Sequence, residues 1–336
     1  MSLITRQYAS LSTMNAVFIA LMLFISACSQ LPTKETQALA AKGELGISTL
    51  EAVTIAADGD NRELSLRIIM PSAAGPFPLI VLSHGTFSSN LRYDLVANYW
   101  AQHGYVVLMP QHPDANYGFT PKSIDDMLQN IETRIIDLQR VLDGLQFIEA
   151  QNAELDGKID HDHYIAAGHS IGAMIAMRVT GLVIQNVGTD TIKATTESRF
   201  QLLVMLSDPG KMRQMPLTAW TGSTVPTFMS TGSEDYGLMG AREAPKNPNI
   251  IVSANNSVDR YQLLLDKGDH YFGGLVQKEV AAEPDHEGLQ IFNETSVMFL
   301  DAYSKDDREA LKYLREVDLL AATNGRATII QELAIE

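Results

Sequence analysis

The sequence predicts an α/β protein whose central sheet is mostly parallel and carries helices on both faces. Leu79–Leu82 and Tyr105–Met109 are short continuous apolar runs, as expected of strands that are buried on both faces. Leu91–His103 and Ile124–Glu149 carry apolar residues at helical spacing. Buried strands that alternate with amphipathic helices are typical of this fold class.

The other predicted elements continue this alternation. Ala52–Ala56 and Leu64–Ile69 alternate apolar and polar residues around an Asp-Gly-Asp-Asn turn, which predicts a β-hairpin. Further strands are expected at Tyr164–Ala167, Gln201–Leu206, Pro226–Met229 and Tyr261–Leu265, with a helix at Ala173–Leu182 and a helical C-terminus from about residue 287.

The composition excludes several classes of protein. The chain has 336 residues, with 25 Lys and Arg against 40 Asp and Glu, which gives a formal net charge of −15. A nucleic-acid-binding protein is expected to carry a basic face instead. Hydrophobic residues make up 46% and charged residues 19%, which excludes intrinsic disorder. The single cysteine, Cys28, excludes an intramolecular disulfide and a zinc cluster of cysteines.

The N-terminal segment indicates a signal peptide. The apolar run Ala16–Ile25 is too short to span a bilayer, which takes about 20 residues, but suits a signal-peptide core of about 7–15 residues. Ile25-Ser-Ala-Cys28 resembles the bacterial lipobox, in which the cysteine is lipidated. A free thiol in an ordinary signal peptide is the alternative. We therefore predict three regions: a lipoprotein signal peptide at 1–27, a lipidated Cys28 with a tether at 28–50, and a folded domain at 51–336.

Gly168-His-Ser-Ile-Gly172 matches the pattern G-x-S-x-G and stands between a predicted strand and a predicted helix. A nucleophilic serine in this pattern needs a sharp, strained turn that exposes its hydroxyl, and the turn needs small residues two positions to either side. Gly168 and Gly172 meet this need. We therefore expect Ser170 to be a nucleophile.

A serine hydroxyl needs a histidine base, and the histidine needs a carboxylate to orient it. Two histidines, His270 and His286, follow Ser170, and His270 comes directly after a predicted strand, whereas His286 lies in an acidic turn. Asp235 ends the segment Val225–Asp235 after another predicted strand, so we expect Asp235 to orient His270. Asp208, at the end of the preceding strand, is the alternative acid.

The negative charge that develops on a substrate oxygen needs backbone N–H donors. We expect one from Ile171, which follows the serine at a helix N-terminus. The second is expected from Thr86, in the loop Ser83-His-Gly-Thr86 after the first buried strand. His84 precedes the serine in the chain, so we interpret it as a structural residue that braces this loop.

Taken together, these motifs resemble the α/β-hydrolase fold. The order Ser170, Asp235, His270, with Phe77–Gly85 and Gly268-Asp-His270, is similar to bacterial predicted dienelactone hydrolases, platelet-activating-factor acetylhydrolases and cutinase-like polyesterases. The resemblance covers about residues 50–300 and implies hydrolysis of carboxylic esters. True dienelactone hydrolases use a cysteine nucleophile, and here serine takes that place.

We therefore expect a serine carboxylic ester hydrolase that forms an acyl-enzyme and acts on an ester with an apolar acyl or aryl group. An acyltransferase of the same fold and a non-catalytic envelope-binding lipoprotein are the alternatives. We expect no cofactor, no nucleic-acid partner and no metal, including at His161 and His163. Gln185–Ser198 is either a lid or a plain loop. Ser29 after Cys28 resembles sorted lipoproteins and indicates a lipid anchor in the outer membrane of a Gram-negative bacterium.

Overall fold

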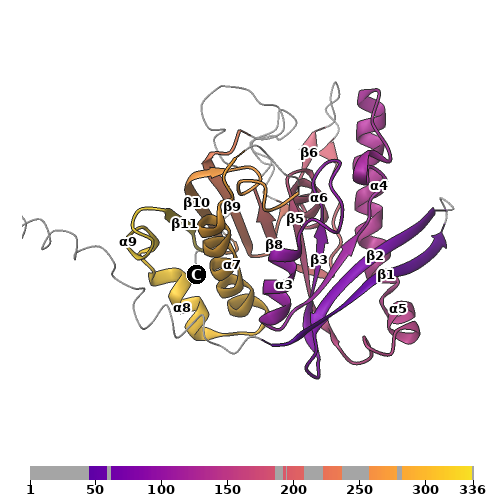
Figure 1. Cartoon of the computed structure of the whole chain (residues 1–336), viewed down its shortest axis with the longest axis horizontal. Coiled ribbons are helices and arrows are strands. Elements are labelled where there is room, and N and C mark those ends of the chain that lie inside the picture. The colour runs from indigo at the N-terminus through magenta and orange to yellow at the C-terminus, as the bar shows by residue number, and fades with distance from the viewer. Residues whose placement is uncertain are drawn as a thin grey trace, which may run out of the picture. The chain divides into compact units, whose positions relative to one another are not determined.

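A nine-stranded sheet organises the described part of the chain (Figure 1). The computed structural model describes residues 45–58, 62–185, 192–193, 195–207, 222–236, 257–277 and 282–334. All of them belong to the unit Gly43–Glu336. The predicted signal peptide, Cys28 and most of the predicted tether lie outside the described residues.

The sheet has the order β1-β2-β4-β3-β5-β8-β9-β10-β11. Its strands are β1 (Ile47–Asp58), β2 (Arg62–Pro71), β3 (Phe77–Ser83), β4 (Val106–Pro110), β5 (Ile159–His169), β8 (Phe200–Leu206), β9 (Thr227–Glu234), β10 (Arg260–Asp269) and β11 (Ala327–Glu332). The short strands β6 (Ile184–Gln185) and β7 (Ile192–Lys193) pair with each other. The helical elements are α3 (Asp94–Gln102), η1 (Ala115–Tyr117), α4 (Ile124–Asp143), α5 (Leu145–Gln151), α6 (Ile171–Val179), α7 (His286–Ser304), α8 (Arg308–Glu316) and α9 (Leu319–Ala322).

The six strands from β4 to β10 are parallel, and antiparallel pairs stand at both edges. The predicted mostly parallel sheet is therefore confirmed. Because parallel strands share one direction, the carboxyl ends of β3, β5, β9 and β10 meet at one edge. Every residue that the sequence predicts for the active site lies on an element or loop at this edge.

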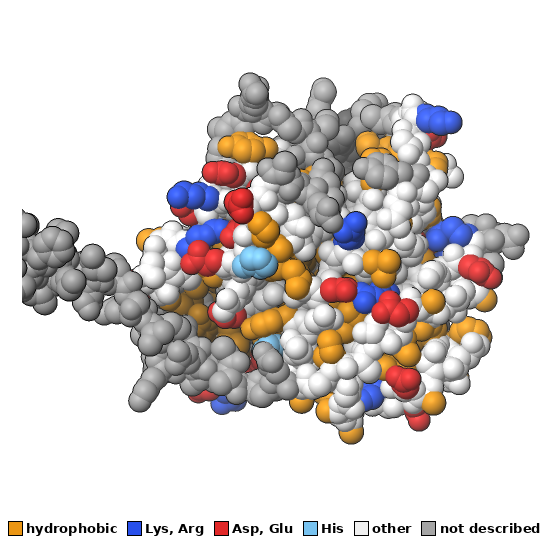
Figure 2. Space-filling view, in the orientation of Figure 1, with side chains coloured by type: hydrophobic (Ala, Val, Ile, Leu, Met, Phe, Trp, Pro, Cys, Tyr) orange, Lys and Arg blue, Asp and Glu red, His pale blue; other side chains and the backbone are white. Residues whose placement is uncertain are grey.

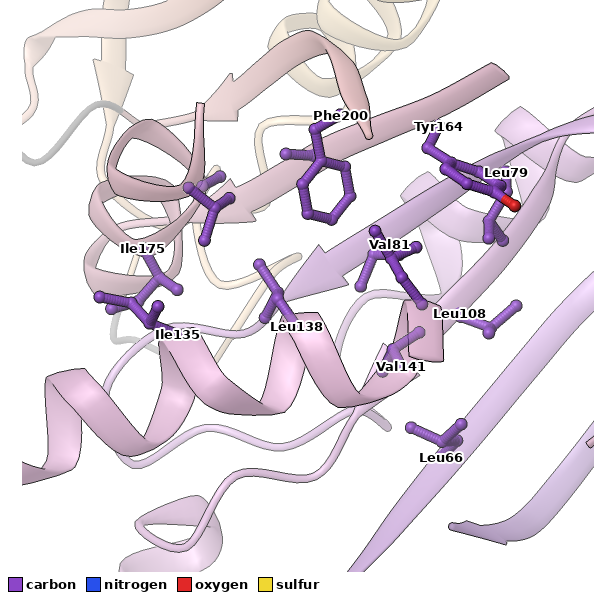
Figure 3. Close-up of a cluster of buried hydrophobic side chains, with 14 of the residues drawn as sticks. Leu66, Leu79, Val81, Leu108, Ile135, Leu138, Val141, Tyr164, Ile175 and Phe200 are labelled. Atoms are coloured by element: carbon purple, nitrogen blue, oxygen red, sulfur yellow. The ribbon is translucent and has the colours of Figure 1, made fainter. Parts of the chain in front are cut away.

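One face of the sheet packs against α4, α5 and α6. The apolar stripe of α4 supplies Ile135, Leu138 and Val141, which face apolar residues of the strands and of α6 (Figure 3). All three are nearly inaccessible to solvent. Burying a side chain of this size contributes about 1.5–3 kcal/mol, so this layer fixes the strands that carry the site.

The opposite face is covered by α3 and α7, which contact each other. Its core is aromatic: the rings of Trp100, Phe228 and Phe292 lie with centroids about 6 Å apart, and those of Tyr261 and Phe299 extend the cluster. Helices on both faces are therefore confirmed. Within the described residues, no helix is both long and apolar enough to cross a membrane.

Several elements differ from the sequence-based expectation, and four of the differences change the description of the fold. Strand β1 starts at Ile47 and pairs with Pro71, so the folded part begins before residue 51 and the predicted tether ends before residue 50. Helix α3 starts at Asp94 rather than at Leu91. The long helix predicted to end at Glu149 is interrupted at Gly144, where a Cβ would lie 2.9 Å from the Ile55 side chain. The C-terminus adds the edge strand β11 to its predicted helices.

Candidate active site

Ser170 lies in a strained turn between β5 and α6. Its backbone has φ 57° and ψ −120°, a conformation that side-chain-bearing residues rarely adopt. A Cβ at position 168 would lie 2.2 Å from the carbonyl carbon of Gly172, and one at position 172 would lie 2.0 Å from the carbonyl oxygen of Ser83. Any side chain at position 168 or 172 would therefore clash with the neighbouring backbone, so both positions around Ser170 require glycine.

Asp235 and His270 follow neighbouring parallel strands, β9 and β10, and form a hydrogen-bonded pair. The Nδ1 atom of His270 lies 2.7 Å from Oδ1 of Asp235, and the hydroxyl of Thr231 donates to the other carboxylate oxygen at 3.3 Å. Both side chains are buried. A carboxylate oxygen accepts this bond, so in a neutral imidazole of His270 the proton is on Nδ1 and Nε2 is the acceptor. This is the tautomer that a general base requires.

The residue before Ser170 holds the loop of His270. Nε2 of His169 lies 2.8 Å from the carbonyl oxygen of His270, and the two imidazole centroids are 5.0 Å apart. Within the described part of the chain, Oγ of Ser170 and Nε2 of His270 are both buried and have no hydrogen-bond partner. The structure thus pairs Asp235 with His270, and His169, the residue before Ser170, holds the His270 loop. Oγ of Ser170 and Nε2 of His270 are not hydrogen-bonded to each other.

The loop that carries Thr86 lies beside the serine turn. The backbone N–H of Gly85 donates to the hydroxyl of Tyr93 at 2.9 Å, and the Gln277 amide donates to the carbonyl oxygen of Thr86 at 3.1 Å. Among the described residues, none accepts a hydrogen bond from the N–H of Thr86 or of Ile171. Within the described residues, the N–H groups of both expected oxyanion donors, Thr86 and Ile171, therefore have no acceptor.

A buried ion pair supports the same loop. Arg134 lies 2.8 Å from Asp114 and donates to the carbonyl oxygens of His84 and Gly85 at 2.6 and 3.3 Å. Asp114 accepts the N–H of Phe87 at 3.3 Å. Although burial raises it, the charge and hydrogen bonds of Arg134 lower the pKa of Asp114 to about 2. The loop is thus clamped by a permanently charged pair, a feature that the sequence did not reveal.

A second serine, histidine and aspartate lie in line beneath this loop. Ser83 Oγ is 2.9 Å from Nε2 of His112, whose Nδ1 is 2.8 Å from Asp137. All three side chains are fully buried, and Ser83 ends strand β3 without the strained turn that Ser170 has. Burial raises the pKa of Asp137 to about 6 and lowers the pKa of His112. His84 donates to its neighbour Gly85 and accepts the N–H of His112. These contacts place His84 within the support of the loop.

The remaining candidates lie elsewhere. His286 is exposed at the first position of α7, and Glu234 is exposed beside Asp235. Asp208 lies outside the described residues. His161 contacts Glu149 and Tyr164, whereas His163 contacts Asp160. Among the described residues, no group of three or more potential ligands is arranged to hold a metal ion.

A parallel sheet with a strained serine after β5, and an acid and a histidine after β9 and β10, defines the α/β-hydrolase fold. Residues 36–192, slightly under half of the chain, match the chlorophyllase family model. A stretch of 46 residues is 46% identical to chlorophyllase type 0 of Chenopodium album. This stretch makes up 14% of this chain and 13% of that protein.

The similarity reaches only part of the candidate site. The matched range includes Thr86, Ser170 and Ile171, whereas Asp235 and His270 lie beyond it. The likeness to dienelactone hydrolases and platelet-activating-factor acetylhydrolases stays a prediction. The chain is thus similar to a family of ester hydrolases over the half that carries the serine turn.

Proposed function

We propose that the chain is a serine carboxylic ester hydrolase. Ser170 is the nucleophile, His270 the general base, Asp235 the residue that orients His270, and Thr86 and Ile171 the oxyanion donors. The observation that carries the proposal is the buried 2.7 Å hydrogen bond from His270 to Asp235, on a loop that is held by His169, the residue before a serine with φ 57°. A base oriented by a carboxylate next to a strained serine is the arrangement of acyl transfer.

The reaction proceeds through an acyl-enzyme. Oγ of Ser170 forms a bond to the ester carbonyl carbon while its proton moves to Nε2 of His270. The carbonyl oxygen becomes an oxyanion that the N–H groups of Thr86 and Ile171 stabilise, and loss of one such donor typically costs about 2.7–4 kcal/mol of barrier. The carbon–oxygen bond to the alcohol breaks as His270 returns the proton. Water then attacks the acyl-enzyme and regenerates Ser170.

The substrate class is proposed from the family and from the surface near the site. A cavity of about 150 Å³ lies beside Gln277, whose amide contacts Thr86, and it is lined by both apolar residues (Leu91, Leu95, Leu275 and Val276) and polar ones (Arg92, Asp94 and Gln277). Figure 2 shows hydrophobic side chains interspersed with acidic and basic ones on the visible face. We propose an ester with an apolar acyl or aryl group. Chlorophyll is the first natural ester to test, because the matched relative is named for it.

The proposal is tested by turnover of a short p-nitrophenyl ester and of chlorophyll by the full chain in detergent. We expect hydrolysis of the short ester, and a decrease of about 10⁶-fold in kcat for Ser170→Ala. Retention of the parent rate by Ser170→Ala sinks the proposal. Release of the acyl group to an added alcohol instead of water identifies an acyltransferase.

A lipid anchor at Cys28 in the cell envelope is a separate part of this proposal. It rests on the sequence Ile25-Ser-Ala-Cys28, which lies outside the described residues. Metabolic labelling with palmitate in a Gram-negative host is expected to mark the parent chain and not Cys28→Ser. Equal labelling of the two chains contradicts the anchor.

A further inference from the structure

His169 bridges the two loops that carry the proposed chemistry. It ends β5 and is fully buried. Its Nε2 lies 2.8 Å from the carbonyl oxygen of His270, and its Nδ1 lies 3.1 Å from the hydroxyl of Tyr93. The same hydroxyl lies 2.9 Å from the backbone nitrogen of Gly85. Three hydrogen bonds therefore join the residue before Thr86 to the backbone of His270.

The chemistry of the groups fixes the direction of each bond. A backbone N–H only donates, so the Tyr93 oxygen accepts from Gly85. A carbonyl oxygen only accepts, so the proton of His169 is on Nε2 and points to His270. Nδ1 of a neutral imidazole is then an acceptor, and the Tyr93 hydroxyl donates to it. One tautomer and one hydroxyl orientation satisfy the whole chain of bonds.

Burial keeps both bridging side chains neutral. Burial is the largest cause that lowers the pKa of His169, to about 3. Burial also raises the pKa of the Tyr93 hydroxyl. The bond directions therefore persist at neutral pH. The bridge is also tightly packed, since a Cβ at position 85 would lie 3.0 Å from Nδ1 of His169.

We propose that Tyr93 and His169 are positioning residues that hold the Gly85–Thr86 loop and the backbone of His270 in register. This inference rests on the proposed esterase function. Both residues act through others, because neither supplies the attacking oxygen, the base or an oxyanion N–H. Their loss therefore lowers kcat and leaves KM nearly unchanged.

Two substitutions of His169 separate its two contacts. In His169→Gln the amide nitrogen replaces Nε2 and still donates to the His270 carbonyl, but the contact with Tyr93 is lost. The shorter side chain of His169→Asn reaches only the position of Nδ1, so it keeps the contact with Tyr93 and loses the one with His270. Because each variant keeps one link of the bridge and breaks the other, we expect kcat to fall about 10–100-fold for both His169→Gln and His169→Asn, with KM nearly unchanged. Tyr93→Phe is expected to lower kcat similarly, and the double variant Tyr93→Phe/His169→Asn no further than the worse single variant.

Tyr105→Phe is the matched control. The hydroxyl of Tyr105 is also fully buried and donates to Asp301 at 2.7 Å, on the α7 side of the sheet. We expect Tyr105→Phe to lower Tm like Tyr93→Phe while kcat stays at the parent value. If His169→Asn fails to fold, the comparison of Tyr93→Phe with Tyr105→Phe tests the positioning role by itself.

Ester turnover and reaction with a fluorophosphonate probe are measured together for the full chain. A parent-level kcat in the Gln or the Asn variant, or an equal decrease for both tyrosine variants, overturns the positioning role. An active parent with unchanged variants overturns only this inference. A folded parent that neither reacts with the probe nor hydrolyses the ester overturns the proposed function as well.

Discussion

Gly172 and Ser83 approach so closely that a Cβ at position 172 would lie 2.0 Å from the Ser83 carbonyl oxygen. Their contact joins the first turn of α6 to the start of the loop that carries Thr86. The nucleophile and the proposed oxyanion donors therefore depend on one backbone-to-backbone contact, which no side chain is able to enter.

Gly172→Ala is expected to lower the free energy of unfolding by about 3 kcal/mol, because the backbone has to move to admit the methyl group. Urea unfolding measures this loss. Gly46→Ala is the control, since a Cβ there meets Ser72 at an ordinary 3.7 Å. Equal stability of the two variants contradicts the close contact.

Asp235→Asn is expected to lower kcat by about 10⁴-fold, because an amide favours the wrong tautomer of His270. Steady-state hydrolysis of a p-nitrophenyl ester measures kcat and KM. Glu234→Gln changes the exposed neighbouring carboxylate and is expected to keep the parent kcat. A decrease in Asp208→Asn, with none in Asp235→Asn, assigns the acid to Asp208 instead.

Arg134→Met is expected to cost about 3–5 kcal/mol of stability, because it leaves Asp114 charged and unpaired in the interior. Denaturant unfolding measures the loss. The double variant Arg134→Met/Asp114→Asn is expected to recover part of it. Asp143→Asn, which removes the exposed partner of Arg199, is expected to change stability by less than about 1 kcal/mol. Similar losses for the exposed and buried pairs contradict this account.

Acid is expected to destabilise the fold. Burial lowers the pKa values of His84, His112 and His169, so all three stay neutral in the folded state. The unfolded chain binds protons on histidine below about pH 6.5, so the free energy of unfolding falls as the pH drops, by up to about 1.4 kcal/mol per pH unit for each histidine.

One carboxyl opposes this trend. Burial raises the pKa of Asp137 to about 6, so the folded state keeps that proton at a pH where the unfolded state has lost it. Three histidines outweigh one aspartate. Urea unfolding from about pH 7.5 to about pH 5 is expected to show a steady loss of stability. Constant or rising stability over this range contradicts the neutral buried histidines.

The sequence predicts the strands of the sheet centre well because they are buried on both faces and read as continuous apolar runs, as in Leu79–Leu82. The sequence does not predict the helix break at Gly144, because the apolar stripe continues across it from Leu142 to Leu145. Strand β11 is not predicted from the sequence either, for a different reason. It lies at an edge and is mostly half-buried, so its pattern is weak.

The candidate site divides in the same way. Ser170 stands in a local pattern, and Asp235 and His270 follow strands in the order that the fold requires, so their approach is expected from chain order. Tyr93 and His169 are 76 residues apart, and their bond depends on how the start of α3 and the end of β5 meet in space. No local pattern marks such a pair. The ion pair of Arg134 likewise joins residues 20 to 50 positions apart in the chain, beyond the reach of a local pattern.

The most direct test of the account is labelling of the folded full chain with a fluorophosphonate probe, followed by mass spectrometry to locate the adduct. We predict a covalent adduct on Ser170, none on Ser83, and loss of the adduct in His270→Ala. A folded chain without any adduct, or an adduct that persists in His270→Ala at the parent rate, contradicts the proposal of an activated serine.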